Sequence, residues 1–496
     1  MGIIKKQSIS GAAYSYAGVA LGFIISGLLF PKILSTSEIG LLRLLVSYSI
    51  LLAQFALLGM NTVTIKIFPY FRNKEKKHHG FLGLLLIVAL LGFILTTAIY
   101  LLGQNIIISD AKAKSELFIP YYYYVIPIFF FTLLFNVFDS YYRVLYNATI
   151  GILYKEIIQR IIIIASIVLF YFKIIDFHFL VVLYAIAQLI PGLFLFLSLI
   201  YEKQLFLKPD FKFLNKSLVN HMISVAFFGI ITAYSGVLIM NIDLVMINHY
   251  LGLSSTGIYS ITFFFGTLII IPARALSKIT AVVIADFWKN NDTKGILDIY
   301  KKSTSLLVIA ASFIFVGIWA NIDNVFKIIG PNYESGKYVI LFIGLANVID
   351  AFSGSSSLII ANSNKYRWLS IFLIIYTVAI IITNIIFIPV MGIAGAAFAS
   401  FISRLIYVLL RFIFLNRIYH FQPYSYKHLL IVIIAVATWY LSTFIPTINN
   451  FLIDILVRSI SVTIVYIFLI FYANISDDFN KTFLNVFSKI IKINKQ

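Results

Sequence analysis

Long apolar segments follow one another along the whole chain, and only short polar segments separate them. A helix needs about 20 mostly apolar residues to cross about 30 Å of hydrocarbon. Fourteen segments meet this requirement, and the residues between them are too few for a folded domain outside the membrane. The pattern predicts an all-α polytopic membrane protein with spans near 10–30, 41–60, 80–103, 125–146, 156–172, 179–200, 219–241, 257–280, 303–320, 338–360, 368–388, 393–413, 429–446 and 453–473.

The composition excludes several other classes of protein. Hydrophobic residues make up 61% of the chain and charged residues only 11%, whereas soluble domains have about 25% charged residues. A soluble core cannot bury this much apolar surface, so a soluble enzyme and a nucleic-acid-binding protein are excluded. The chain has no Cys, and its seven His residues lack metal-ligand spacing. The segment Gly330–Lys337 has five residues between its glycines, where a phosphate-binding loop has four. We therefore expect no catalytic site, metal site, cofactor or ATPase activity.

Basic residues predict the orientation of the spans. With the N-terminus in the cytoplasm, 28 of the 38 Lys and Arg residues fall in cytoplasmic segments or the adjoining helix ends, among them Arg411, and 8 fall outside, among them Arg458. This asymmetry is the positive-inside pattern, and an even number of spans then places both termini in the cytoplasm. His78 and His79 belong to a basic cytoplasmic loop, where exposure to solvent is expected. The segment 203–216 interleaves Phe with Lys, which predicts a helix lying on the membrane surface.

Two short patterns occur twice at nearly equal offsets. Leu34–Leu42 is similar to Leu251–Tyr259, 217 residues later, and Asn136–Asp139 is similar to Asn347–Asp350, 211 residues later. A shift of six spans keeps the membrane orientation, so the two halves form a parallel repeat, as in transporters whose halves move about a central site. The repeat predicts two six-helix lobes, then two extra helices with an amphipathic cytoplasmic tail, at residues 1–217, 218–428 and 429–496.

The segment Asn384–Ser400 carries a resemblance to a known family. Its sequence, Asn384-Ile-Ile-Phe-Ile-Pro389-Val-Met-Gly392-Ile-Ala-Gly395-Ala-Ala-Phe-Ala-Ser400, is similar to the turn between the eleventh and twelfth helices of the multidrug/oligosaccharidyl-lipid/polysaccharide (MOP) exporter superfamily. Within it, the chain resembles the polysaccharide-biosynthesis branch of O-antigen repeat-unit flippases. Segments 34–40, 251–259 and 330–333 resemble further turns of this family. In the quoted segment we expect Pro389 to end a helix and Gly392 to permit a tight bend.

This resemblance implies a function and a set of partners. The substrate would be an oligosaccharide linked to undecaprenyl diphosphate, moved across the inner (cytoplasmic) membrane for surface polysaccharide biosynthesis. Neither a charged diphosphate nor a polar glycan crosses hydrocarbon unaided, so a hydrated, partly cationic cavity is needed. The protein would contact membrane lipids and supply a glycan polymerase and its chain-length machinery, and nucleic acid is not an expected partner.

Charged side chains within the spans are the first candidates for site residues. A rise of 1.5 Å per residue places Asp350 about 18 Å and Arg404 about 16 Å from the outer ends of their spans, so the two are natural partners. The repeat places Asp139 at the depth of Asp350, and Arg143 follows it at the spacing of an intrahelical pair. Two interpretations stay open. Either these pairs tie helices together, or they line a wet cavity in which arginine binds the diphosphate.

Five other polar residues complete the candidate set. Asn136 and Asn347 each lie one helical turn from an aspartate of the repeat. Arg43 and Arg274 lie near helix ends, where their side chains either extend to the interface or line the cavity. Lys66 falls where the resemblance implies a basic residue in the family, although the positive-inside pattern also explains it.

Three alternative functions differ from the one that the resemblance favours. A lipid II flippase shares the fourteen spans. A drug/cation antiporter of the same superfamily usually has twelve spans and often an acidic residue in the first, whereas residues 10–30 contain none. A membrane glycan polymerase would need a large outer loop, and the longest outer loop here, about 104–124, is too small to fold separately.

Overall fold

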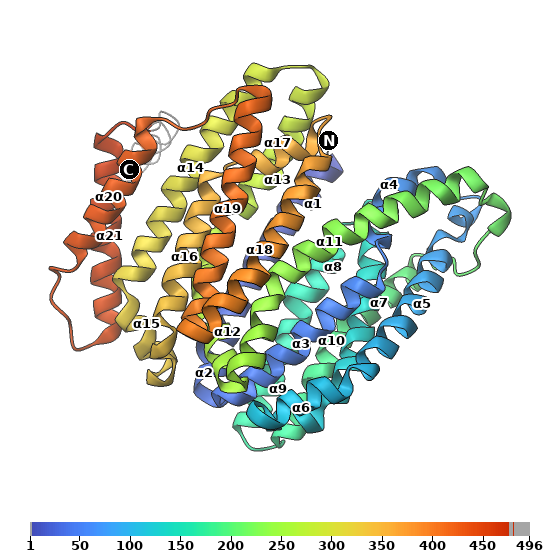
Figure 1. Cartoon of the computed structure of the whole chain (residues 1–496), viewed down its shortest axis with the longest axis horizontal. Helices are drawn as coiled ribbons and strands as arrows, with labels where there is room; N and C mark the ends of the chain where they lie inside the picture. Colours follow the sequence, from blue (N-terminus) through green and yellow to red (C-terminus); the bar gives the residue numbers. More distant parts are fainter. Residues whose placement is uncertain (1, 476–479, 481–496) are drawn as a thin grey trace, which may run out of the picture. The chain divides into compact units, whose positions relative to one another are not determined.

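The structure, a computed structural model, describes residues 2–475 and residue 480, and this part of the chain is helical without any β-strand. Twelve of its helices are long and apolar enough to cross a membrane. The two other predicted spans correspond to the shorter apolar helix α20 (Tyr426–Ser442) and to the helical run Ile150–Tyr171, which contains three charged residues. The prediction of an all-α polytopic membrane protein is therefore confirmed (Figure 1).

Contacts divide the chain into two compact units. Unit 1 consists of Met1–Ile261 and Ile380–Ile393, and unit 2 consists of Thr262–Ala379 and Ala394–Gln496. The helices α12, α18 and α19 have residues in both units. The two six-helix lobes of the repeat are a different division of the chain, and they stay a prediction.

Unit 1 is built mainly from the helices of the first half of the sequence. Its elements are α1 (Gly2–Phe23), η1 (Ile24–Leu29), α2 (Phe30–Ile33), α3 (Thr36–Ala56), α4 (Met60–Phe71), η2 (Lys77–Gly80), α5 (Phe81–Leu102), α6 (Gln104–Lys114), η3 (Glu116–Tyr124), α7 (Val125–Val144), α8 (Ile150–Leu153), η4 (Tyr154–Ile158), α9 (Gln159–Tyr171), α10 (Phe177–Tyr201), η5 (Phe211–Phe213), α11 (Lys216–Leu251) and α12 (Leu253–Thr267).

The core of unit 1 forms where α3, α4, α5, α7 and α10 pack together. Helix α3 begins with a capping box, because the Ser35 hydroxyl accepts from the backbone NH of Glu38 and the Glu38 carboxylate accepts from the backbone NH of Ser35. Fully buried aromatic side chains fill the space between these helices, among them Phe68, Phe81 and Tyr141. Their burial fixes which face of each helix points inward.

Two π-helical turns interrupt the helices of unit 1, η1 in the first span and η4 between α8 and α9. Such turns are rare and occur frequently at functional sites. The turn η4 packs against α1, where Arg160 bonds to Glu156 and to the carbonyl of Gly18. The two π-helical turns therefore lie in helices of unit 1 that contact each other.

Unit 2 holds most of the remaining helices and has a core of its own. Its core lies between α14, α20 and α21 and contains Val308, Ile431, Tyr466 and Ile470. Its elements are η6 (Leu268–Ile270), α13 (Ile271–Lys289), α14 (Thr293–Ala320), α15 (Ile322–Ile329), η7 (Pro331–Gly336), α16 (Lys337–Phe352), α17 (Ser356–Asn362), α18 (Arg367–Met391), α19 (Ile393–Tyr419), α20 and α21 (Phe451–Tyr472).

The structure corrects two local predictions. Pro389 lies inside α18, which continues to Met391, and the bend follows at Gly392 with a φ of +60°. In the segment 203–216, predicted as a surface helix, residues 203–215 form an irregular connection with only the short η5 turn, and Lys216 begins α11. The predicted amphipathic tail lies outside the described residues, apart from residue 480.

Candidate functional site

Asp350 stands at the centre of an ionic cluster in unit 2. It occupies the last turn of α16, and the chain then bends at Gly354, with a φ of +51°, before α17 begins. Arg404 Nη1 lies 3.5 Å from Asp350 Oδ2, and Arg411 Nη2 lies 3.0 Å from Asp350 Oδ1. A carboxylate near the C-terminal end of a helix is opposed by the helix dipole, so two guanidinium groups from α19 compensate for this unfavourable position. The structure thus pairs Asp350 with Arg404 as expected and adds a second arginine.

The two arginines have different surroundings. Arg411 is 4% exposed, donates to the Ser357 hydroxyl and has its guanidinium 4.1 Å from the Tyr407 ring centroid. Arg404 is 16% exposed and lies 5.4 Å from the Tyr376 ring centroid. Arg411 therefore acts as the tighter tie between helices, whereas Arg404 holds the carboxylate at a longer distance and is more accessible.

Arg411 and Arg458 are both buried in the structure, more deeply than the positive-inside pattern predicts. Arg411 was expected at a cytoplasmic helix end, but α19 continues for two further turns, to Tyr419, and buries it. Arg458, expected in an outer segment, is also buried in α21, where its Nε lies 2.7 Å from Asp454 Oδ2. Asn324 of α15 donates to the same carboxylate. Arg458 also donates to the carbonyl of Ser442, the last residue of α20, and to that of Ile445 in the following connection. This second cluster ties the α20–α21 connection to α15.

In unit 1, Asp139 and Arg143 form the intrahelical pair expected on α7. The Asp139 side chain is 8% exposed, whereas that of Arg143 is 56% exposed, so the guanidinium has room for another anion. Gly151 approaches so closely that a Cβ there would lie 1.9 Å from Asp139 Oδ1. Lys155 of η4 places its ammonium 4.8 Å from the centroid of a phenylalanine ring on α7.

The other predicted residues lie apart from these pairs. Arg43 donates to the Ser26 hydroxyl at 2.6 Å and is half-buried against Phe30. Asn347 is buried and donates to the carbonyl of Gly266 at 2.9 Å, so it ties α16 to α12. The remaining three are Asn136, which is half-buried on α7, and the exposed Arg274 and Lys66.

A buried polar cluster in unit 1 escaped the sequence analysis. Asp243 of α11 accepts from the Tyr259 hydroxyl at 2.7 Å and from the side-chain amide of Asn384 at 2.7 Å. All three residues are buried, and Asn384 opens the segment that carries the family resemblance. The available signal was an acidic residue in the apolar sequence of α11, since a charged group at such a position is costly.

The two copies of the repeated turn meet in unit 1. Gly40 of α3 and Gly257 of α12 face each other so closely that neither could carry a side chain. A Cβ on Gly40 would lie 2.0 Å from the carbonyl oxygen of Leu253, and a Cβ on Gly257 would lie 1.9 Å from that of Thr36. The hydroxyls of Thr36 and Ser254 lie 2.8 Å apart beside this crossing. Small residues allow such an approach of helices, and we call this contact the glycine crossing.

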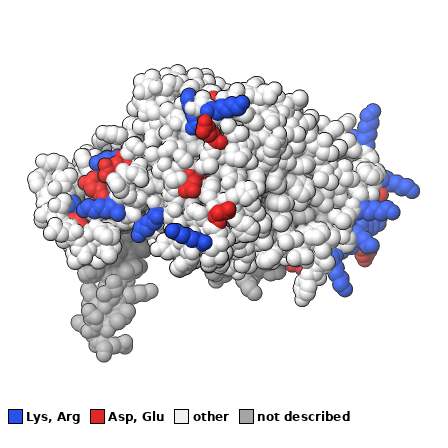
Figure 2. Space-filling view, turned by 90° about the horizontal axis from the view of Figure 1, so that it is seen from below, with Lys and Arg blue, Asp and Glu red and all other residues white. Residues whose placement is uncertain are grey.

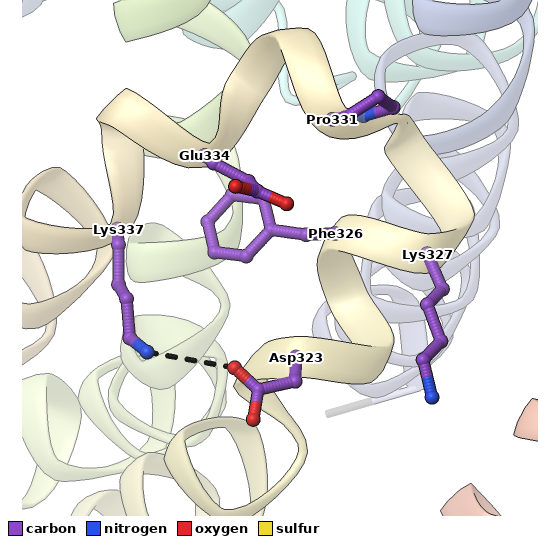
Figure 3. Close-up of a pocket in the computed structure, with 6 residues that line it drawn as sticks. All are labelled: Asp323, Phe326, Lys327, Pro331, Glu334 and Lys337. Carbon is purple, nitrogen blue, oxygen red and sulfur yellow. Dashed lines mark hydrogen bonds and ion pairs between the residues drawn. The ribbon is translucent and has the colours of Figure 1, made fainter.

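A surface pocket of about 500 Å³ lies in unit 2 around η7 (Figure 3). Its lining includes Asp323 and Lys337, whose charged atoms are 3.5 Å apart, with Phe326 between the two sides. Exposed ion pairs of this kind contribute little to stability. Within the described residues, no group of three or more His, Cys, Asp or Glu side chains is placed to hold a metal ion.

Twelve helices able to cross a membrane, with buried ion pairs between them, place the protein in the class of polytopic membrane proteins. The fold is similar to that of a lipid II flippase, MurJ, in an inward closed conformation, with a TM-score of 0.71 and 17% identity over 92% of this chain and 98% of that one. It is also similar to an inward-facing multidrug resistance MATE family transporter of the MOP superfamily, with a TM-score of 0.61 and 16% identity over 84% of this chain and 99% of that one. An outward-facing MATE transporter of the superfamily matches with a TM-score of 0.51 and 13% identity over 83% of this chain and 94% of that one.

The chain also matches the family described as polysaccharide biosynthesis protein, over residues 6–284. No curated protein matches it. The chain belongs to the polysaccharide biosynthesis protein family, and its fold is similar to that of MOP superfamily transporters.

Proposed function

We propose that this protein is a flippase that moves an undecaprenyl-diphosphate-linked oligosaccharide from the cytoplasmic to the outer leaflet of the cytoplasmic membrane. The observation that carries this proposal is the cluster in which Arg404 and Arg411 share the single carboxylate of Asp350. These three side chains carry one net positive charge at membrane depth, which favours an anionic substrate. Membership in the polysaccharide biosynthesis family supports a sugar-bearing substrate.

Arg404 is the residue that we assign to the diphosphate in this cluster. A guanidinium can bind two phosphate oxygens at once through parallel N–H donors. Arg411 keeps the carboxylate neutralised while Arg404 turns to the substrate, so the exchange strands no buried charge. Arg143, paired with Asp139 yet more than half exposed, offers a second cation of the same type on α7.

Alternating access requires that one side of the protein closes while the other opens. In the predicted orientation the glycine crossing lies toward the outer side, because α3 and α12 follow outer turns. The close contact between α3 and α12 is consistent with a closed outer gate, in which the two helices must separate before the glycan leaves. Released units would then pass to the glycan polymerase and its chain-length machinery.

The orientation itself is open to a direct measurement. Reporter fusions at Lys76, Lys212 and Lys294 should report cytoplasm, because the basic segments stay inside. Fusions near Lys114 and Asn332 should report the outer side. A reporter at the C-terminus that is found outside would contradict the even number of spans.

The function is tested by following the lipid-linked sugar in cells that lack this protein. Synthesis of the repeat unit should continue, while leaflet-specific labelling should find the units only on the cytoplasmic side, with loss of surface polysaccharide. The wild-type gene should restore outer labelling. Normal outer labelling in a strain without a second flippase would refute the proposal.

The same experiment separates the other candidates. A lipid II flippase is the second candidate, because a protein of that kind shares the fold over nearly its whole length, and its loss would trap lipid II instead. Loss of a drug/cation antiporter would leave glycans normal and change the sensitivity to cationic compounds. Loss of a polymerase would leave single units on the outer face.

A further inference from the structure

The connection between α10 and α11 packs against a turn with left-handed backbone angles that immediately precedes α5. Lys77, His78, His79 and Gly80 follow one another with φ angles of +52°, +51°, +50° and +64°. Non-glycine residues adopt this conformation only singly as a rule, so surrounding contacts must hold the turn. Both histidines are buried, not solvated as expected from a basic loop. The buried ring of His78 lies beside Phe68, 5.3 Å away between centroids.

His79 binds the α10–α11 connection to this turn. Its Nδ1 lies 3.0 Å from Asp210 Oδ2, and its ring stacks on Phe213 with centroids 3.8 Å apart. The backbone NH of Asp210 donates to the carbonyl of His79, and that of Gly83 donates to the carbonyl of Phe206. The hydrogen bond from His79 lowers the pKa of Asp210, so the carboxylate stays ionised and is directed to the turn.

Two glycines allow the connection to lie this close. A Cβ on Gly80 would lie 1.9 Å from the carbonyl oxygen of Lys208, and a Cβ on Gly83 would lie 2.0 Å from that of Leu207. The path of the connection is therefore fixed by backbone contacts on one side. Its other side faces away from the protein.

The side chains of the connection divide between these two sides. Phe206 and Phe213 point inward, with ring centroids 5.9 Å from His78 and 5.0 Å from Phe71, respectively. Leu207 is 50% exposed and Phe211 is 63% exposed, and lysines stand on either side of them. The outward side, which we call the basic linker surface, consists of Leu207, Phe211 and the exposed residues Lys74, Lys76, Lys208 and Lys212.

This surface lies at a membrane boundary. The membrane-crossing helix α10 ends at Tyr201 and α11 begins at Lys216, so the connection stays next to the headgroups. Figure 2 shows Lys and Arg side chains gathered at the right-hand end of unit 1, where Figure 1 places the α4–α5 and α10–α11 connections. Lysine clusters beside membrane helices attract anionic lipids, and exposed apolar side chains between them insert at the interface.

We propose that the basic linker surface binds the anionic phospholipid headgroups of the adjacent leaflet, with Leu207 and Phe211 inserted among them. Two observations favour an anionic lipid as the bound partner: the surface is rich in lysine, and it lies beside the headgroups. The exposed Leu207 and Phe211 would have no apolar environment against nucleic acid. The inference goes beyond the proposed transport function and holds for any substrate.

The absence of Cys in the chain allows a clean spectroscopic test. Phe211→Cys in the full chain is labelled with an environment-sensitive dye and placed in nanodiscs of phosphatidylcholine, with or without phosphatidylglycerol. We expect a blue shift of emission and weaker quenching by neutral acrylamide only when phosphatidylglycerol is present. Because the Debye length falls to about 3 Å at 1 M salt, high salt should reverse both changes.

Matched variants separate this surface from general effects of charge. Lys208→Gln with Lys212→Gln should abolish the shift, whereas Lys294→Gln with Lys301→Gln, in the first turns of α14, should keep it. A dye at Asn290→Cys should show no dependence on phosphatidylglycerol. Equal spectra of the Phe211 label in both lipids, a shift that survives high salt, or an equal loss in the Lys294/Lys301 control would overturn the proposal.

Discussion

Replacing Asp350 with leucine should remove most of the folded protein from the membrane. The change leaves Arg404 and Arg411 without their shared carboxylate, and one uncompensated buried charge costs about 3–5 kcal/mol. That cost is a large part of the stability of an ordinary domain. The measurement is the amount of protein in isolated membranes, together with its unfolding temperature in detergent.

Arg404→Gln should behave differently, with a normal protein level but loss of surface glycan. Arg411 still compensates Asp350 in this variant, so no charge is stranded, whereas the group assigned to the diphosphate is gone. Arg417→Gln, an exposed position on the same helix, is the matched control and should retain both level and glycan. If Arg404→Gln lowers the protein level as much as Asp350→Leu does, the cluster is a structural tie and the substrate role fails.

The second arginine changes how a rescue experiment must be designed. Removing Asp350 and Arg404 together leaves Arg411 buried without a carboxylate, so this double variant should not recover the protein level. Replacing all three by apolar residues should recover it, because a buried ionic group can often be exchanged for hydrophobic residues without loss of stability. The triple variant would still lack transport if the proposed role of Arg404 holds.

The sequence could predict the spans and the pairing of Asp350 with Arg404, because hydrophobic runs and a fixed helical rise carry that information. The positive-inside pattern assigned Arg411 to a cytoplasmic helix end because the twelfth apolar run was expected to end at residue 413, whereas α19 extends to Tyr419. A helical signal was nevertheless present. Residues 404, 407 and 411 recur at three- and four-residue spacing and share one face of a helix.

Other parts of the structure depend on contacts that no local pattern contains. Asp243 and Asn384 lie 141 positions apart, and only the folded chain brings the carboxylate and the amide together. The connection at 203–216 has the Phe and Lys alternation of a surface helix, but His79 draws Asp210 and Phe213 toward the protein. Tertiary contacts therefore override the local preference at this site.

The glycine crossing offers the most direct control over the proposed transport cycle. It joins the two copies of the repeated turn, Gly40 and Gly257, at backbone distances that leave no room for a methyl group. If both sides of the protein must open in turn, this contact has to separate in every cycle. A covalent bond across it should therefore stop transport without unfolding the protein.

Thr36→Cys combined with Ser254→Cys supplies that bond, because the two native hydroxyls lie 2.8 Å apart and the chain has no other thiols. Under oxidising conditions the double variant should form a cross-link, visible as altered mobility on a gel, and outer-leaflet labelling of the lipid-linked sugar should fall to the level of cells lacking the protein. A reductant should restore labelling, and each single cysteine variant should transport normally under both conditions. Undiminished labelling by fully cross-linked protein would mean that α3 and α12 stay together throughout the cycle, and the crossing would then be a fixed joint instead of a gate.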